Sequence, residues 1–149
     1  MPSETVIEIR KLTGYFYKYN AYKTYPTLAN GVTLTTDDGN WTDGNYTEVI
    51  PSNTITSPFY VHSCILYHGN NTIDYEVDIS YGTVGNEIII GTVPYFSTDA
   101  NNEIELIFIL PIKLPANTRI SAKTRCEDIV VPANAHSIDI KIRYRINLI

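Results

Sequence analysis

The feature that most constrains the fold is the strict alternation of apolar and polar residues in SIDIKIRYRINLI, residues 137–149. Apolar side chains occupy every second position from residue 138 to residue 148, and polar side chains occupy the positions between them. Successive side chains of a β-strand point to opposite faces, so this pattern indicates a half-buried strand. Residues 73–81 and 118–126 repeat the pattern. Each of these strands therefore has one face for a core and one for solvent or a partner.

Three further runs are apolar on both faces: residues 59–67, 87–93 and 105–110. We expect such strands to be covered on both sides, the second cover being a loop or a neighbouring subunit. Gly91 inside the second run indicates a bulge or a close approach of backbone.

Asx- and Gly-rich turns separate these runs, which favours an all-β fold. We predict an antiparallel β-sandwich, jelly-roll-like, with strands near residues 59–67, 73–81, 87–93, 103–110, 118–126 and 137–148. With 149 residues and 44% hydrophobic residues, one domain can bury a core without disulfides. We expect Cys64 and Cys126 to be buried free thiols.

The stretch LPIKLPANTRISAKTRC, residues 110–126, is interpreted as a corner of the sandwich. Proline cannot donate to a strand ladder, so Pro111 and Pro115 should terminate or bend a central strand. The residues after Pro115 then turn the chain, and Arg119 begins the return strand.

The first 25 residues differ from the rest, because period two weakens after Ile9 and aromatic residues alternate with lysines. We predict an arm at residues 1–25 that docks on a neighbour, and a sandwich domain at residues 26–149. The competing interpretation is that this segment closes the sandwich of its own subunit. The arm's candidate interface residues are Tyr15, Phe16, Tyr17, Lys18, Tyr19 and Tyr22.

Charged residues mark the outward faces of three predicted strands. One is acidic and two are basic, so they can pair across adjacent strands or between subunits. We favour an exposed acidic face over an acid/base pair or a calcium site. As candidate subunit or capsid contacts we select Asp74, Glu76, Asp78, Arg119, Lys123, Arg125, Lys141, Arg143 and Arg145.

No metal-binding, nucleophile or phosphate-binding motif occurs, so we expect no enzymatic activity, no metal and no cofactor. His62 is expected to be a core or interface residue. The net charge of −5 gives no global attraction for nucleic acid, and no apolar run reaches the length of a membrane span. Trp41, between two turns, is either a sugar platform or a loop anchor.

The second half of the chain resembles small β-sandwich virion proteins of tailed bacteriophages. The resemblance rests on a glycine followed by a strand that begins with glutamate. It rests further on a proline-flanked turn that precedes a strand with basic residues. Asn117 stands where the pattern has glycine and Lys123 where it has arginine, and asparagine tolerates a left-handed turn. The matching residues are Gly82 or Gly85, Glu87, Pro111, Pro115, Thr118, Arg119, Ile120, Ala122 and Lys123.

The resemblance implies a non-enzymatic capsid decoration (cement) protein, or a tail or neck component, in the virion after assembly in the host cytoplasm. It implies a symmetric homo-oligomer, with a trimer favoured, in contact with the major capsid protein or other virion proteins. The alternative is a carbohydrate-binding, lectin-like module or a tail or baseplate receptor-binding component, in which Trp41 contacts glycan.

Overall fold

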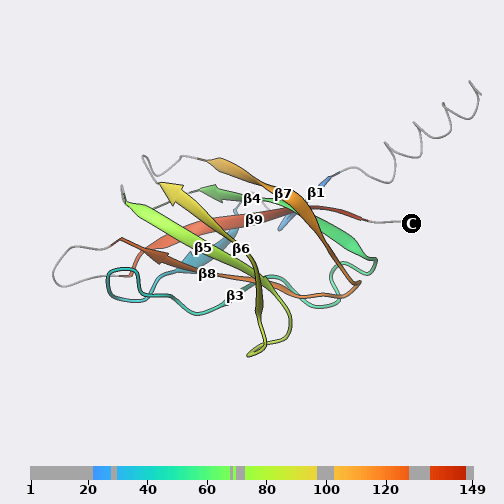
Figure 1. Ribbon diagram of the computed structural model, residues 1–149, viewed down its shortest axis with the longest axis horizontal. Coiled ribbons are helices and arrows are strands. Elements are labelled where there is room, and N and C mark those ends of the chain that lie inside the picture. The colour runs from blue at the N-terminus through green and yellow to red at the C-terminus, as the bar shows by residue number, and fades with distance from the viewer. Residues whose placement is uncertain are drawn as a thin grey trace, which may run out of the picture.

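A computed structural model describes residues 22–27, 30–67, 69, 73–96, 103–127 and 135–146, which form nine strands (Figure 1). All their pairings are antiparallel. The strands are β1 (Lys23–Tyr25), β2 (Val32–Thr35), β3 (Thr47–Ile50), β4 (Phe59–Tyr67), β5 (Asp74–Tyr81), β6 (Ile88–Phe96), β7 (Ile104–Leu114), β8 (Ile120–Cys126) and β9 (Ser137–Ile146).

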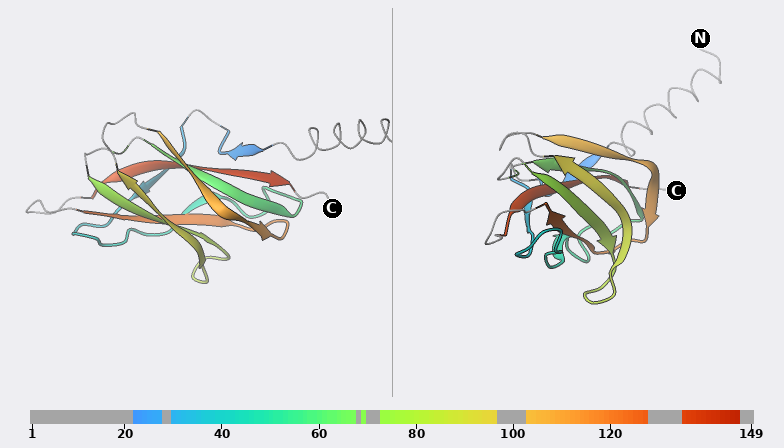
Figure 2. Two further views of the ribbon diagram at one scale, coloured as in Figure 1. Left: turned by 45° about the horizontal axis from the view of Figure 1, so that its top comes forward. Right: turned by 60° about the vertical axis from the view of Figure 1, so that its left-hand side comes forward.

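The strands form two sheets that face each other (Figure 2). One sheet has the order β2–β9–β4–β7, and β1 continues the β2 edge along β9. The other has the order β3–β8–β5–β6. From β2 to β9 the chain changes sheet at every connection except the β5–β6 hairpin. A five-stranded and a four-stranded sheet connected in this way form a jelly roll, so the predicted fold class is confirmed.

The core lies between the inner faces of the two sheets, where the alternating apolar residues of β5, β8 and β9 meet those of β4. Cys64 and Cys126 are both buried in it as free thiols. Burial raises the pKa of Cys64 to about 12, so its thiol stays protonated and inert at neutral pH.

The six predicted strands all form, within a few residues of the expected ends. The sequence did not predict β1, β2 or β3, which have only three or four residues each. β1 covers the last residues of the expected arm and pairs with β9 of the same chain. The boundary drawn at residue 25 therefore falls after a strand of the sandwich. Residues 1–21 lie outside the described residues, and the arm stays a prediction.

The proline-flanked corner forms as expected, with one correction. The chain passes from one sheet to the other between β7 and β8, and Asn117 turns it with a φ of 64°. Pro115 follows the end of β7, whereas Pro111 lies within this strand, where the pairing with β4 jumps from Ile112 to Ile107. The prediction of a central strand was wrong, because β7 is the edge of its sheet, the position that tolerates a proline.

The irregular segment of β7 contacts β6 of the other sheet. Phe108, in the interrupted segment, lies over Gly91 of β6, where a Cβ atom would stand 3.0 Å from the Phe108 ring. The pairing of β6 with β5 shifts register beside Gly91. Of the two alternatives for this glycine, the bulge is confirmed, and the close neighbour is a side chain and not another backbone.

The loop between β2 and β3 is held along β8. The backbone N–H groups of Trp41 and Gly44 donate to the carbonyls of Cys126 and Thr124, at 2.7 and 2.9 Å. A Cβ atom on Gly44 would stand 1.9 Å from the carbonyl oxygen of Thr35, a backbone atom that cannot move aside cheaply.

We therefore expect Gly44→Ala to destabilise the protein by about 3 kcal/mol, because the clash must displace either the loop or β2. Gly85→Ala is the matched control, since its added Cβ meets nothing within 4 Å and only its φ of 83° is unfavourable. The control should lose about 1 kcal/mol. Urea unfolding of both variants measures the difference. Equal losses would contradict the close approach at Gly44.

Candidate interaction surfaces

Five of the charged side chains form one cluster on the outer face of β5 and β8, here called the β5–β8 ion network. Arg125 contacts Asp78 at 3.1 Å, Glu76 at 2.6 Å and Asp43, from the β2–β3 loop, at 3.1 Å. Lys123 contacts Asp43 at 2.6 Å and Asp78 at 3.9 Å. The network joins two neighbouring strands to the loop that lies along β8.

The network corrects the expectation of an exposed acidic face. Asp78 is only 4% exposed, because Arg125, Lys123 and the hydroxyl of Thr92 surround its carboxylate. Asp74, at the start of the same strand, is exposed. Of the two pairings that the sequence left open, the structure shows the one between adjacent strands of a single subunit.

Arg119, directly before β8, does not belong to this network. It is buried, and its guanidinium contacts Glu48 at 3.0 Å, Glu87 at 3.2 Å and the carbonyl oxygen of Gly82 at 3.2 Å. These partners come from β3 and from the β5–β6 turn. Within one subunit, Arg119 thus ties these segments together, and its burial leaves little of it for a partner.

The cations of β9 lie on the outer face of the other sheet, so they do not meet the acidic strand. Arg143 pairs with Glu105 of β7 at 2.7 Å. The ammonium group of Lys141 lies 5.6 Å from the ring centre of Tyr67, and the guanidinium of Arg145 lies 4.9 Å from that of Tyr60. Stacking on an aromatic face is a favourable but modest cation–π contact.

Of the predicted arm residues, the structure describes only Tyr22, and residues 15–19 lie outside the described residues. The Tyr22 ring packs on His62, with ring centres 4.3 Å apart. His62 is half-buried, and its Nδ1 is buried without a hydrogen-bond partner among the described residues. This contact covers the extra residue of the β4 bulge, between Val61 and Ser63.

Large apolar side chains are exposed along one side of the sandwich, where β6 and β7 lie next to each other (Figure 2). Ile88 and Ile89, at the start of β6, are 55% and 48% exposed, and Ile107 of β7 is 64% exposed. We call this region the β6–β7 side. We expected a second cover over these two-sided apolar strands. No segment that the structure describes covers them.

Trp41 lies at the other end of the four-stranded sheet from the β5–β6 turn, close to the start of β5 and the end of β6. It is 40% exposed, and its ring lines an open groove of about 430 Å³ together with Phe96 and Asp74. Its backbone N–H is anchored on Cys126 of β8. The loop-anchor interpretation is therefore correct for the backbone, while the ring stays available.

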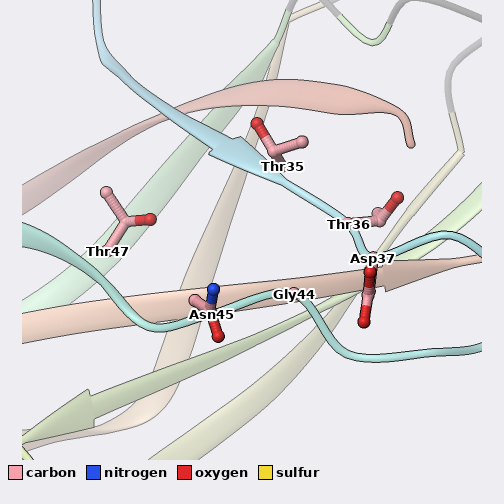
Figure 3. Close-up of a pocket in the computed structure, with 6 residues that line it drawn as sticks. All are labelled: Thr35, Thr36, Asp37, Gly44, Asn45 and Thr47. Atoms are coloured by element: carbon pink, nitrogen blue, oxygen red, sulfur yellow. The ribbon is translucent and has the colours of Figure 1, made fainter.

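A second hollow of about 330 Å³ lies where β2 ends and β3 begins, and its lining is polar (Figure 3). The Thr36 hydroxyl already accepts the N–H of His136 at 2.9 Å, and the Asp37 carboxylate accepts the N–H of Asp38 at 2.8 Å. These two polar groups of the hollow are thus already engaged in hydrogen bonds within the protein. The lining residues are Thr35, Thr36, Asp37, Gly44, Asn45 and Thr47.

The described residues contain no cluster of three or more His, Cys, Asp or Glu side chains that could hold a metal ion. In the same part of the chain, no helix is long and apolar enough to cross a membrane.

No family model and no curated protein matches the sequence. Solved structures to which the chain is similar include a chain of infectious bursal disease virus, Gx strain, with 10% identity and a TM-score of 0.45 over 87% of this chain and 33% of that one. Others are the insecticidal delta-endotoxin Cry8Ea1 from Bacillus thuringiensis (12% identity, TM-score 0.46, 78% and 20% covered) and Eiger TNF from S. frugiperda (12%, 0.42, 87% and 92%). This chain thus spans about a third of the viral chain and a fifth of the toxin. At such identities and TM-scores, these likenesses carry no argument about this chain.

Sequence reasoning missed three contributors to these surfaces. Asp43 lies in a turn about 80 residues from its partners, and no spacing rule joins it to β8. Glu105 looked like the polar start of an apolar run, and its pairing with Arg143 depends on strand order. Phe96 lies three residues beyond the end of the strand predicted at residues 87–93, and nothing in the sequence placed it beside Trp41.

The ion network should make the protein sensitive to acid. Burial opposes the ionisation of Asp43, but hydrogen bonds and charge from Lys123 and Arg125 outweigh it and hold its pKa below the ordinary value. A carboxyl group with a lowered pKa stabilises the fold above its unfolded pKa of about 3.9, and this stabilisation is lost as the pH falls through the folded pKa.

We expect Asp43→Asn to be less stable than the wild type at pH 7, with a difference that shrinks as the pH drops below about 4. Urea unfolding between pH 7 and pH 2 measures this difference. Asp38→Asn, which removes an exposed carboxylate outside the network, is the control. A difference for Asp43→Asn that does not change with pH would contradict the proposed role of the network.

Proposed function

We propose that the protein is a non-enzymatic virion structural protein that works by assembly, with the β6–β7 side as the contact between subunits. In its finer form, the proposal is a capsid decoration protein that binds and stabilises a phage head as a symmetric oligomer, with a trimer favoured. The virion location and the trimer come from the resemblance in the second half of the sequence. The contact surface comes from the structure.

The observation that carries the proposal is the contrast between the two sides of the sandwich. On one side the edge strands β2 and β3 have four residues each. On the other, the edges β6 and β7 have nine and eleven residues and expose three isoleucines. Long apolar edges invite pairing with another chain, and proteins normally shorten or cover them. We therefore propose that a partner chain covers this side of the sandwich.

A second copy of this chain fits the β6–β7 side. β6 contains no charged residue, so two copies can approach there despite a net charge of −5 each. Pro94 removes one backbone donor, which limits any added ladder to the first part of β6. Symmetric self-association is also the commonest arrangement among soluble oligomers.

The outer face of the β9 sheet is the proposed contact with the capsid. Among the described residues, Lys141 and Arg145 have no carboxylate partner and only stack on tyrosine rings. Their positive charge can be offered to an acidic surface.

Ile89→Lys and Ile107→Lys should each weaken self-association at least tenfold, about 1.4 kcal/mol, because a lysine would be desolvated in an apolar contact. Light scattering at tens of micromolar should give an oligomer for the wild type and a lower mass for both variants. Thr33→Lys, on the opposite edge of the five-stranded sheet, is the control and should keep the wild-type mass. A monomeric wild type, or variants with unchanged mass, would contradict the assembly proposal.

The capsid contact has its own test. The double variant Lys141→Glu, Arg145→Glu should lose occupancy on virions, measured by quantitative mass spectrometry of purified particles, while its solution mass stays that of the wild type. Lys23→Glu is the control. Lys23 is exposed, but its partner in the strand pairing is Tyr144, whose side chain faces the core, so Lys23 does not lie on the outer face of the sheet. Unchanged occupancy of the double variant would rule out this face, and absence of the wild-type chain from particles would rule out the virion role.

A further inference from the structure

The groove beside Trp41 has no part in the proposed assembly. It lies over the end of the four-stranded sheet, where Asp74 of β5 is paired with Phe96 of β6. Its volume of about 430 Å³ falls in the range of small-molecule sites. The lining residues are Trp41, Asp74, Tyr75, Glu76, Pro94, Tyr95 and Phe96.

The groove combines two exposed aromatic rings with a buried aromatic floor. Trp41 and Phe96 are 40% and 47% exposed. Tyr75 and Tyr95 are buried beneath them, with ring centres 5.9 Å apart. The floor is part of the core and is fixed, so the groove exists before any ligand arrives.

Trp41 is held in an unusual conformation. Its φ of 55° lies in the left-handed region, which a tryptophan rarely adopts, and its N–H donates to Cys126 on β8. Residues kept in such conformations by their surroundings cluster at ligand-binding sites. A platform fixed in advance loses little conformational freedom on binding.

Two carboxylates at the groove supply hydrogen-bond acceptors. The Asp74 carboxylate makes no hydrogen bond or ion pair within the described part of the chain. Glu76 binds Arg125 through Oε2, at 2.6 Å, which leaves its Oε1 for another donor. Acceptors of this kind suit hydroxyl donors, whereas an anion would be repelled by Asp74 and by the net charge of −5.

We propose that this groove binds a neutral glycan. A hexose has an apolar C–H face that can stack on Trp41 or Phe96, whose ring faces carry negative partial charge. Its hydroxyl groups donate to Asp74 and to the unused oxygen of Glu76. An open groove with exposed rings suits a flat sugar ring, and an organic cation, which can also stack on a single ring, is the competing ligand that the test includes.

The chain offers a direct reporter, because Trp41 is its only tryptophan. An array of neutral oligosaccharides, probed with the fluorescently labelled full-length protein, identifies the sugar. Titration of that sugar should then change the Trp41 emission in a saturable way. Asp74→Asn and Phe96→Ala should each weaken binding at least tenfold while the unfolding transition stays in place, since both side chains are exposed.

Asp38→Asn, on the same loop as Trp41 but outside the groove, is the matched control and should bind like the wild type. The proposal is overturned if no neutral glycan on the array binds, or if Asp74→Asn and Phe96→Ala bind as the wild type does. It is also overturned if tetramethylammonium or a lysine-rich peptide saturates the Trp41 signal and the sugar does not.

Discussion

Burial of the inner faces of four central strands is the constraint on which the rest of the structure depends. β4 and β9 present their apolar residues to those of β5 and β8, and each of these strands has a neighbour on both sides. In two sheets of this order, the edges are β6, β7, β3 and the edge beside β9 that β1 and β2 form together. The two short edges share one side and the two long edges share the other. The uncovered isoleucines are thus a consequence of topology, and the assembly proposal rests on that consequence.

The outer faces of the two sheets are used differently. On β5 and β8 the charges neutralise each other within the subunit, and the loop carrying Asp43 completes the arrangement and presents Trp41. On β9 only Arg143 has an acidic partner among the described residues, and its neighbours stack on tyrosines. The charges of the first sheet therefore contact one another within the subunit, whereas Lys141 and Arg145 of the second sheet keep a positive charge that we propose for a partner.

The sequence predicted most of the fold because period two is a local property. The alternation in β5, β8 and β9 needs no knowledge of strand order, and the turn at Asn117 follows from the residues around it. The pairing of charges could not be predicted, because Asp43 meets Arg125 only after the β2–β3 loop lies along β8. For the same reason, the two-sided apolar run in β7 predicts a central strand, although β7 lies at an edge.

The central claim is that a second copy of the chain covers the β6–β7 side, and amide hydrogen exchange at two protein concentrations tests it most directly. Raising the concentration from below to above the assembly range should slow exchange in β6 and β7. Exchange in the short edges β2 and β3 should not change. Equal exchange in β6 and β7 at both concentrations, in a sample whose mass has risen, would mean that the subunits meet elsewhere and would contradict the claim.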